Sequence, residues 1–480
     1  MDYHIAKGDE VVWMDCNGEL PFCQPNPDHK KSKCKECVKR KNKGLKLLNR
    51  SVRRIPLGRI DKNVKVLPDV KNIEELKKHK FDHLEGGLGT VSSLISVVRD
   101  PSPDLGVYGD IWKRAYFSTY NIYVKAQNIF KEEYFDRVYI FNGRYANEKG
   151  ILNACQKANL EYFIHERGRD KDHYMIYENA MPHNIAAFKM RMEKMWSESE
   201  IAEEDKYKIG AQFYTEREKG KIQSWVSFTN DQNPDVLPEN WDNKKTNITI
   251  YMSSEDEMAS ISDEWRSPVY SSQLQGIKMI LSDCSQGINF YLRIHPNLMG
   301  VKNKELDELL SLSYPNLTII PAASPVSSYS MMKNSTKVLT FGSTAGIEAT
   351  FWGIPSILAG VSFYRGIGAT YDANSHEDVI KLIKDDLQPK DKLTAIKYGY
   401  YQKSFGEKYL NYKAQNFYFG TYKGKSIYGN WFYSNVIRTL STLKILLYVK
   451  RKIKKFRHFL NNRNNLGKTL VLVVISSVIP

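Results

Sequence analysis

The sequence predicts an α/β protein with parallel sheets, and two observations on residues 247–360 predict it. Apolar segments of four to seven residues, typical of buried strands, alternate with helical segments of about ten residues. Polar motifs directly follow two of these strand segments. Strands and helices in alternation indicate right-handed βαβ units. Because ligands of such sheets bind at the carboxyl ends of the strands, we expect a binding site where the polar motifs lie.

The predicted elements of this half follow one another in a regular order. Strands are expected at 248–252, 288–294, 317–320 and 337–341. Helices are expected at 271–283, 304–312, 327–333 and from 345 through Glu348, and an apolar segment follows at 353–358. This order predicts one sheet whose strands are joined by helices.

A second alternating region precedes the first. Strands are expected at 11–14, 137–141 and 160–164, with a helix at 146–158. A glycine-rich stretch at 85–93 leads into an apolar helix. Its glycines predict either a loop in which backbone N–H groups approach an anion or an ordinary turn.

Composition divides the chain into five segments. Residues 196–245 are rich in charged and amide side chains and contain proline breakers, which is typical of a connection between domains. We predict an amino-terminal domain at 1–195 with a Cys-rich basic segment at 16–54, the connection at 196–245, a carboxyl-terminal domain at 246–390, helices packing back across the junction at 391–440, and a basic and apolar tail at 441–480.

The formal net charge of +16 is concentrated near the two ends of the chain. Residues 29–54 carry a net +11 and residues 444–468 a net +9, so the rest of the chain carries −4. Separate basic patches suit docking on an anionic membrane surface better than a continuous nucleic-acid groove. Residues 444–460 mix apolar and basic side chains like an interfacial helix, although a solvated basic helix is the plain alternative.

The sequence contains no recognisable secretion signal or membrane span. Its first ten residues are polar, and no stretch reaches the roughly 18–20 apolar residues that cross a bilayer. The apolar residues at 470–480 are too few to span a membrane and are consistent with a buried strand, a membrane-dipping tail or part of a longer segment. We therefore expect synthesis in the cytoplasm.

Cysteine usage favours metal or redox chemistry over disulfides. Four of the six cysteines lie within the first 37 residues: Cys16, Cys23, Cys34 and Cys37. In a cytosolic protein such clustering is typical of a metal site or a redox pair. The second pair has the spacing of a zinc knuckle, and the first pair could complete a tetrahedral thiolate site. Structural zinc is one interpretation, and thiols without metal are the other.

Polar residues at consecutive strand ends predict a nucleotide-binding site. His295, with Arg293 two residues before it, can hydrogen-bond a phosphate and stabilise its charge. Ser343 and Thr344 open a helix, where N–H groups and the helix dipole favour an anion. Glu348 lies one turn further on and can accept hydrogen bonds from a ribose. Each residue alone also fits a helix cap, a surface carboxylate or a buried imidazole, but together they favour a site.

Four segments carry a resemblance to a known family. They are Arg293-Ile294-His295-Pro296, Pro325-Val-Ser-Ser-Tyr329, Phe341-Gly-Ser-Thr-Ala-Gly-Ile-Glu-Ala349 and Gly353-Ile354-Pro355. They resemble the carboxyl-terminal domain of bacterial capsule polysaccharide biosynthesis glycosyltransferases, whose wider relatives include capsule Kdo transferases, bacterial sialyltransferases and teichoic-acid-type transferases. The resemblance implies two Rossmann-like domains facing a cleft (the GT-B fold), with the donor nucleotide in the second domain. It implies that His295 contacts the donor phosphate, that Ser343 and Thr344 lie beside it, and that Glu348 faces the nucleotide.

The catalytic base is left open, because the acidic motif that supplies it in the sialyltransferase relatives is not evident. An inverting transferase needs a carboxylate or His within reach of the acceptor hydroxyl. Glu166, Glu85 and Asp15 are the alternatives, and Glu166 ranks first because it follows a strong strand close to a glycine. The acceptor is expected to bind Asn142, Arg144 and Arg167, whose guanidinium groups suit an anionic sugar or a lipid phosphate.

The sequence therefore predicts a metal-independent glycosyltransferase on the inner face of the cell membrane. It would transfer a sugar from a CMP-, UDP- or GDP-linked donor to a growing capsule or O-antigen polysaccharide, or to its lipid-linked acceptor. No nucleic acid partner and no catalytic cofactor are expected. The alternatives are a CDP-polyol phosphotransferase, a nucleotide-sugar epimerase of the same fold, and a non-catalytic polysaccharide assembly protein.

Overall fold

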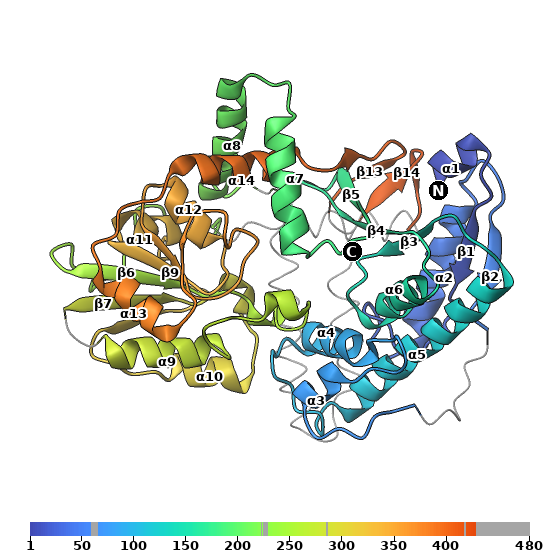
Figure 1. The fold of residues 1–480 in the computed structure, drawn as a ribbon, viewed down its shortest axis with the longest axis horizontal. Helices are drawn as coiled ribbons and strands as arrows, with labels where there is room; N and C mark the ends of the chain where they lie inside the picture. Colours follow the sequence, from blue (N-terminus) through green and yellow to red (C-terminus); the bar gives the residue numbers. More distant parts are fainter. Residues whose placement is uncertain (59–65, 222, 224–228, 285–286, 417–418, 429–480) are drawn as a thin grey trace, which may run out of the picture. The chain divides into compact units, whose positions relative to one another are not determined.

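A computed structural model describes residues 1–428 except 59–65, 222, 224–228, 285–286 and 417–418 (Figure 1). The basic and apolar tail predicted at 441–480 lies outside the described residues. The chain forms two compact units. The larger comprises residues 12–35 and 53–409, and the smaller comprises residues 1–11, 36–52 and the chain from 410 onward. The larger unit contains both predicted α/β regions, which we call the amino-terminal and the carboxyl-terminal lobe.

The carboxyl-terminal lobe contains a six-stranded sheet in which every pair of neighbours is parallel. Its strands are β6 (Thr246–Tyr251), β7 (Ile288–Arg293), β8 (Leu317–Ile320), β9 (Lys337–Thr340), β10 (Ser356–Leu358) and β11 (Tyr371–Asp372). Their order is β11-β10-β9-β6-β7-β8, so the winding direction reverses between β6 and β9. This is the strand order of a Rossmann domain, in which ligands bind at the reversal.

Helices cover both faces of this sheet (Figure 1). One face packs on α9 (Gln273–Asp283), α10 (Lys304–Leu310) and α13 (His376–Lys384). The other packs on α11 (Ser328–Asn334) and α12 (Ala345–Phe351). Side chains alternate along β6, with Ile248 and Ile250 on the first face and Tyr251 on the second. The predicted α/β class and parallel sheet are confirmed, with element boundaries within a few residues of those expected.

The amino-terminal lobe is built on a smaller, mixed sheet. Its strands are β3 (Val138–Phe141), β4 (Tyr162–Arg167), β5 (His173–Glu178) and β12 (Glu407–Lys408), in the order β12-β5-β4-β3. Only β3 and β4 are parallel, joined by α6 (Ala146–Lys157), and the other pairs are antiparallel. A separate pair of parallel strands, β1 (Val12–Asp15) and β2 (Arg53–Pro56), contains the first predicted strand.

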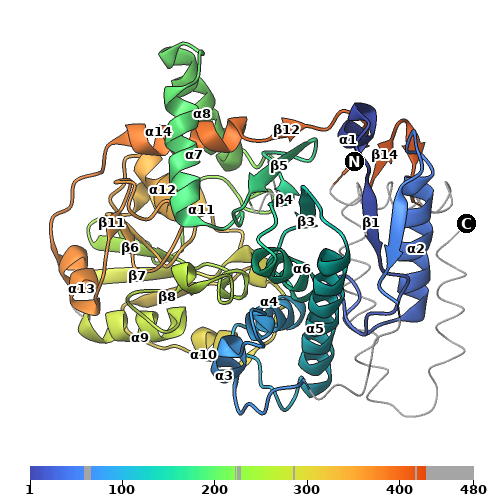
Figure 2. The same cartoon turned by 45° about the vertical axis from the view of Figure 1, so that its right-hand side comes forward.

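The glycine-rich stretch is a helix rather than a loop. The helix α4 begins at Gly86 and runs to Val98 (Gly86–Val98). It packs with α3 (Ile73–Lys78), α5 (Gly109–Glu132) and α6 (Figure 2). A Cβ at Gly87 would lie 1.8 Å from the backbone oxygen of Leu76, and one at Gly89 would lie 2.9 Å from the side chain of Lys149. These glycines are therefore explained by close helix packing, not by approach to a ligand.

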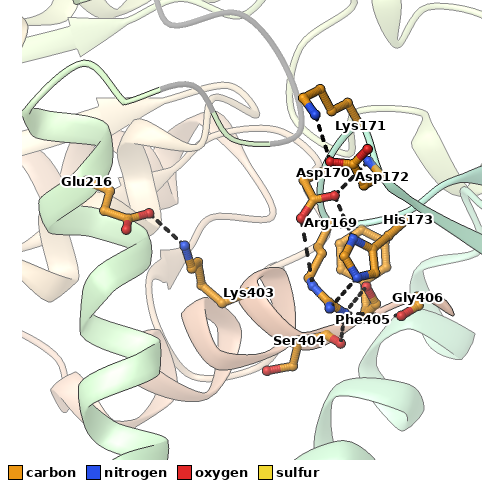
Figure 3. Close-up of polar contacts among 10 residues, drawn as sticks. All are labelled: Arg169, Asp170, Lys171, Asp172, His173, Glu216, Lys403, Ser404, Phe405 and Gly406. Atoms are coloured by element: carbon orange, nitrogen blue, oxygen red, sulfur yellow. Dashed lines mark hydrogen bonds and ion pairs between the residues drawn. The ribbon is translucent and has the colours of Figure 1, made fainter. Parts of the chain in front are cut away.

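Three helices connect the lobes: α7 (Ile185–Ser197), α8 (Glu203–Glu218) and α14 (Lys392–Ser404). They share an aromatic core with α12. Figure 3 shows how the end of α14 is held. The Arg169 guanidinium donates to the carbonyls of Ser404 (2.9 Å) and Gly406 (3.1 Å), and Lys403 forms an ion pair with Glu216 of α8 (2.6 Å). A cation at the carbonyl end of a helix is favourable, so this contact fixes where α14 stops.

The smaller unit contains α1 (Asp2–Lys7), the residues of α2 (Lys31–Leu45) from Glu36 onward, and an antiparallel sheet of β13 (Tyr412–Ala414), β14 (Gly420–Tyr422) and β15 (Lys425–Ser426). The Asp2 carboxylate accepts hydrogen bonds from Asn411 (2.7 Å) and Tyr422, which joins the first helix to this sheet. Within the described part of the chain, no helix combines the length and the apolar character needed to cross a membrane.

Candidate active site

The strand reversal brings the ends of β6 and β9 together. Ser253 follows β6, and the loop Gly342-Ser343-Thr344 follows β9. Ser253 is 3% exposed, and its Oγ makes no hydrogen bond among the described residues. A Cβ at Gly342 would lie 3.3 Å from this Oγ, so the hydroxyl faces the loop. A buried hydroxyl without a partner is costly and indicates a place that a polar ligand completes.

The loop after β9 is held rigidly. Ser343 Oγ accepts a hydrogen bond from the backbone N–H of Ala345 (3.3 Å), and the Ser343 carbonyl accepts one from the Tyr364 hydroxyl. A Cβ at Gly360 would lie 2.0 Å from the Phe341 carbonyl oxygen, so the chain after β10 passes directly against the end of β9. Both residues that were predicted beside the phosphate, Ser343 and Thr344, are half-buried in this loop.

Glu348 is buried at 4% exposure and bound on both carboxylate oxygens. Its Oε1 accepts from Thr344 Oγ1 (2.9 Å) and pairs with Arg217 (3.1 Å), and its Oε2 accepts from the Tyr329 hydroxyl. A carboxylate taken out of water needs such partners. The predicted ribose contact therefore competes with bonds that join α8, α11 and α12.

Arg217, on α8, was not identified from the sequence because it lies in the predicted connection. Its Nη2 also donates to Thr344 Oγ1 (3.1 Å), so one guanidinium holds the carboxylate and the loop. Burial lowers its pKa, but the Glu348 carboxylate outweighs this and the net pKa of Arg217 is raised. The spacing from Phe213 and Tyr214, four and three residues earlier, is the signal that could have placed Arg217 on the buried side of α8.

His295 lies directly after Ile294 at the end of β7, as predicted. The Asn297 backbone N–H donates to its Nδ1 (3.1 Å), so the neutral ring carries its proton on Nε2. Burial lowers the pKa of His295 to about 4, and the Asp256 carboxylate opposes this shift. Three cations add to the lowering: Arg99, Arg217 and Arg293. A half-buried neutral imidazole among three guanidinium groups marks a region of positive potential that suits an anion.

Arg293 is 2% exposed and is directed at the backbone rather than at solvent. Its guanidinium donates to the carbonyls of Pro321 and Ser324, both at 3.3 Å. These contacts hold the loop between β8 and α11. Arg293 therefore contributes positive charge to the site from a buried position. Its direct contact with phosphate stays a prediction.

The loop after β6 joins the two lobes and was also missed. The Asp256 carboxylate pairs with Arg99 at the end of α4, and Ser254 Oγ donates to it (2.6 Å). Asn297 Nδ2 donates to Glu257 (2.6 Å), so this loop reaches the residues after His295. The sequence signal was available: Ser253-Ser254-Glu255-Asp256 follows a strand, as the two recognised motifs do.

A pocket beside this loop contains residues of both lobes. Arg99 and Pro101 come from the amino-terminal lobe, and Ser253, Glu255 and Glu305 are among those from the carboxyl-terminal lobe. Burial and the other carboxyl group raise the pKa of Glu255, and burial raises that of Glu305. The pocket walls therefore favour one shared proton over two negative charges, next to the cations around His295.

On the amino-terminal lobe the structure brings Asn142 and Glu166 together. Asn142 follows β3 with a left-handed φ of 57°, and its Nδ2 donates to Glu166 Oε2 (2.6 Å). Arg144 is 6% exposed; its Nε donates to Ser92 Oγ (2.6 Å) and its Nη1 to the carbonyl of Glu257 (2.8 Å). Arg144 thus joins the lobes, whereas Arg167 is exposed at the end of β4.

The other two predicted bases are paired with cations. Asp15 is buried and accepts from Arg54 Nε (2.7 Å). Glu85 lies between Lys80 (3.2 Å) and Lys149 (3.4 Å). Burial raises the pKa of Glu85, but the two lysines outweigh it and the net pKa is lowered. A carboxylate held by cations is a weak proton acceptor, so Asp15 and Glu85 are less suited than Glu166 to act as the general base.

The four amino-terminal cysteines, all of them described, form no disulfide. Cys16 Sγ accepts from the backbone N–H of Gly18 (3.4 Å), and burial raises the pKa of the Cys16 thiol. Across the described ranges, no three His, Cys, Asp or Glu side chains are grouped so that they could hold a metal ion. Structural zinc at Cys16, Cys23, Cys34 and Cys37 stays a prediction.

Comparison with protein families identifies the carboxyl-terminal lobe. Residues 243–413 match the family described as "Capsule polysaccharide biosynthesis protein". This segment of the chain is similar to that family. It contains the whole six-stranded sheet, His295 and the loop after β9, and the resemblance inferred from the sequence is confirmed. Arg217 and the amino-terminal lobe, except its strand β12, lie before the matched segment.

Solved structures show only distant likeness. A beta Kdo 2,4 transferase, KpsC of Thermosulfurimonas dismutans, is 13% identical over 55% of this chain and 79% of its own, with a TM-score of 0.36. The UDP-GlcNAc 2-epimerase of Methanocaldococcus jannaschii is 13% identical over 81% of this chain and 97% of its own, with a TM-score of 0.26. Likeness at this level assigns no activity. No curated protein matches the chain.

Proposed function

We propose that the protein is a glycosyltransferase that moves a sugar from a nucleotide-activated donor to a growing surface polysaccharide, capsule or O-antigen, or to its lipid-linked acceptor. The capsule polysaccharide biosynthesis domain supports the pathway, and the chemistry around the strand reversal supports the reaction class. Donor sugars of this kind carry a phosphate that leaves with negative charge. The site must therefore bind an anion and stabilise it as the sugar departs.

The single observation that carries this proposal is the concentration of unsatisfied and positive groups at one edge of the sheet. Ser253 Oγ is buried without a hydrogen-bond partner in the described chain, and it faces Gly342. Burial and three arginines lower the pKa of His295, so the site carries positive charge that favours a phosphate.

These groups supply the charge that a catalytic metal supplies in other transferases. Arg99, Arg217 and Arg293 surround His295, and each is fixed by bonds to Asp256, Glu348 or backbone carbonyls. Preorganised cations stabilise a leaving phosphate without rearranging during the reaction. Metal-independent transfer with no catalytic cofactor is part of the proposal. The acceptor would bind the amino-terminal lobe at Asn142, Arg144 and Arg167.

The location is proposed from the same reasoning. Nucleotide-sugars are made in the cytoplasm, and lipid-linked acceptors lie at the membrane. The basic residues at 29–54 and 444–468 would attract the protein to the anionic inner face of the membrane. The second of these segments lies outside the described residues, so this part rests on sequence alone.

Nucleotide-dependent thermal stability tests the proposal. The melting temperature is measured with CMP, CDP, UDP, GDP and ADP, for the wild type, His295→Ala and the control His83→Ala, whose histidine is exposed. Ligand at about a hundred times Kd adds roughly 2.7 kcal/mol of stability. We expect one nucleotide class to raise the melting temperature of the wild type and of His83→Ala but not of His295→Ala. No response to any nucleotide would refute the donor site and favour the assembly protein.

A further inference from the structure

We propose that Glu148 is the general base that deprotonates the acceptor hydroxyl, an assignment that rests on the proposed transferase function. The three carboxylates that the sequence indicated as the general base are all held by other groups in the structure. Asp15 and Glu85 are paired with cations, and Glu166 accepts hydrogen bonds from Asn142 (2.6 Å) and from the Arg167 backbone N–H (2.9 Å). A base needs an accessible lone pair aimed at the substrate.

Helix register places Glu148 at the substrate-facing edge of the amino-terminal sheet. It lies in the first turn of α6, four residues before Leu152 and seven before Cys155. Leu152 and Cys155 pack against Ile140 of β3 and Ile164 of β4. Residues at i, i+4 and i+7 share one helix face, so Glu148 lies over the carboxyl ends of these parallel strands.

This edge of the sheet faces the donor lobe. Arg144, four residues before Glu148, donates from Nη1 to the carbonyl of Glu257 (2.8 Å). The neighbouring loop before α7 is joined to the same lobe, since Trp265 Nε1 donates to the carbonyl of His183 (2.8 Å). Glu257 follows Asp256, whose charge acts on His295. The first turn of α6 and the donor-phosphate region therefore lie on either side of the η1 turn (Glu255–Glu257).

Glu148 has no counterion among the residues that the structure describes. In the described chain its carboxylate forms no ion pair or side-chain hydrogen bond. The residue is half-buried, so part of it is open to solvent. The adjacent cations are engaged elsewhere, Arg144 with Ser92 and Glu257 and Lys149 with Glu85. Burial raises the pKa of Glu148 to about 7, opposed by its own backbone N–H and by no charged side chain. A carboxyl group with a pKa near neutrality is well matched to general-base catalysis.

The step is a single displacement. The Glu148 carboxylate takes the proton of the acceptor hydroxyl as the oxygen forms a bond to the anomeric carbon of the donor sugar. The bond from that carbon to the donor phosphate oxygen breaks, and the nucleotide leaves with the electron pair towards His295. The proton on Glu148 then passes to solvent, which restores the carboxylate.

The test compares Glu148→Gln with the wild type and with Glu166→Gln and Glu85→Gln. A panel of CMP-, UDP- and GDP-sugars is assayed for nucleotide release, first with water as acceptor and then with surface polysaccharide as acceptor. For the donor that the wild type uses, we expect Glu148→Gln to lower kcat at least about 100-fold. We expect it to leave the nucleotide-induced rise in melting temperature unchanged. In the wild type we expect kcat/KM to rise with pH through about 7, and in Glu148→Gln we expect this rise to be absent.

Stability supplies a second readout. The folded pKa of Glu148 is raised, so its stabilising neutral form is lost as pH increases through about 7. Gln keeps the neutral shape, so Glu148→Gln should melt at a higher temperature than the wild type at pH 8 and at nearly the same temperature at pH 4, below the ordinary glutamate pKa of 4.5. A variant that is less stable at pH 8 would show a structural carboxylate and overturn the assignment.

The outcomes separate the base from the proposed function. Retained turnover in Glu148→Gln, with loss in Glu166→Gln, overturns Glu148 and leaves the transferase intact. If the wild type releases no nucleotide and binds none, the proposed function fails and the base assignment fails with it.

Discussion

The two lobes differ in the sheet that each is built on and in the charge partners of the carboxyl groups at the strand ends. In the carboxyl-terminal lobe the sheet has six parallel strands, and two buried carboxylates near its reversal are paired with cations, Glu348 with Arg217 and Asp256 with Arg99. In the amino-terminal lobe the sheet is mixed, and one carboxyl group at its edge, Glu148, has no counterion in the described chain.

The difference corresponds to the two kinds of chemistry that a transferase needs. Holding a phosphate requires fixed positive charge, which is stable only when each cation is itself held by an anion or a carbonyl. Accepting a proton requires a carboxylate whose ionisation is easily reversed, which pairing with a cation would prevent. Breaking the pairs in one lobe should therefore damage folding and donor binding, whereas changing the lone carboxylate should damage turnover alone.

The largest effect is expected from Arg217→Ala. Removing the cation leaves Glu348 buried with an uncompensated charge, which costs about 3 kcal/mol of the free energy of unfolding and removes the nucleotide response. Chemical denaturation measures the first and melting temperatures with nucleotide the second. The double variant Arg217→Ala/Glu348→Gln should recover part of the stability.

The control for Arg217→Ala is Lys333→Ala. Lys333, on α11, forms an ion pair (2.5 Å) with Glu218, the residue that follows Arg217 on α8, and the substitution removes this pair. That pair is partly exposed, so its loss should cost at most about 1 kcal/mol. Equal losses in Arg217→Ala and Lys333→Ala would contradict the central place given to Arg217.

Gly360→Ala should have a smaller effect, with a counterpart in the other lobe. A Cβ at Gly360 would lie 2.0 Å from the Phe341 carbonyl oxygen, and one at Gly87 would lie 1.8 Å from that of Leu76. Backbone must move in both cases, at about 1–3 kcal/mol. Only Gly360→Ala displaces the loop after β9, so it alone should weaken nucleotide binding. Isothermal titration calorimetry measures the nucleotide affinity of both variants. Equal affinities would contradict a role of the loop after β9 in nucleotide binding.

The sequence was sufficient for the carboxyl-terminal lobe because local and long-range signals agree there. The strands are continuous apolar runs, two of them are followed by a polar motif, and the family match covers the same residues. His295, Ser343 and Thr344 follow strands that meet at one edge, so their proximity follows from topology. The pairing order β11-β10-β9-β6-β7-β8 could not be read, because strand order is set by packing between distant segments.

The amino-terminal lobe was read less completely for physical reasons. The glycines of α4 signal either a ligand loop or close helix packing, and only the contact of Gly87 with Leu76 decides between them. β5 follows β4 after a tight turn and carries no period that separates it from a loop. Glu148 and Arg217 were missed because their roles depend on which charges lie beside them, and charge neighbours come from distant parts of the chain.

The smallest change sharpens the comparison most directly. Ser253→Ala removes a buried hydroxyl that has no hydrogen-bond partner among the described residues, so the unliganded protein should gain about 1 kcal/mol of stability. Its nucleotide-induced rise in melting temperature should fall, because the hydroxyl is expected to bind the donor phosphate. The control is Ser335→Ala, whose hydroxyl donates to the Met331 carbonyl (2.7 Å) and whose loss should destabilise the protein. If Ser253→Ala is destabilising and binds nucleotide as the wild type does, the hydroxyl has a structural role, and the positive groups around His295 must hold the phosphate without it.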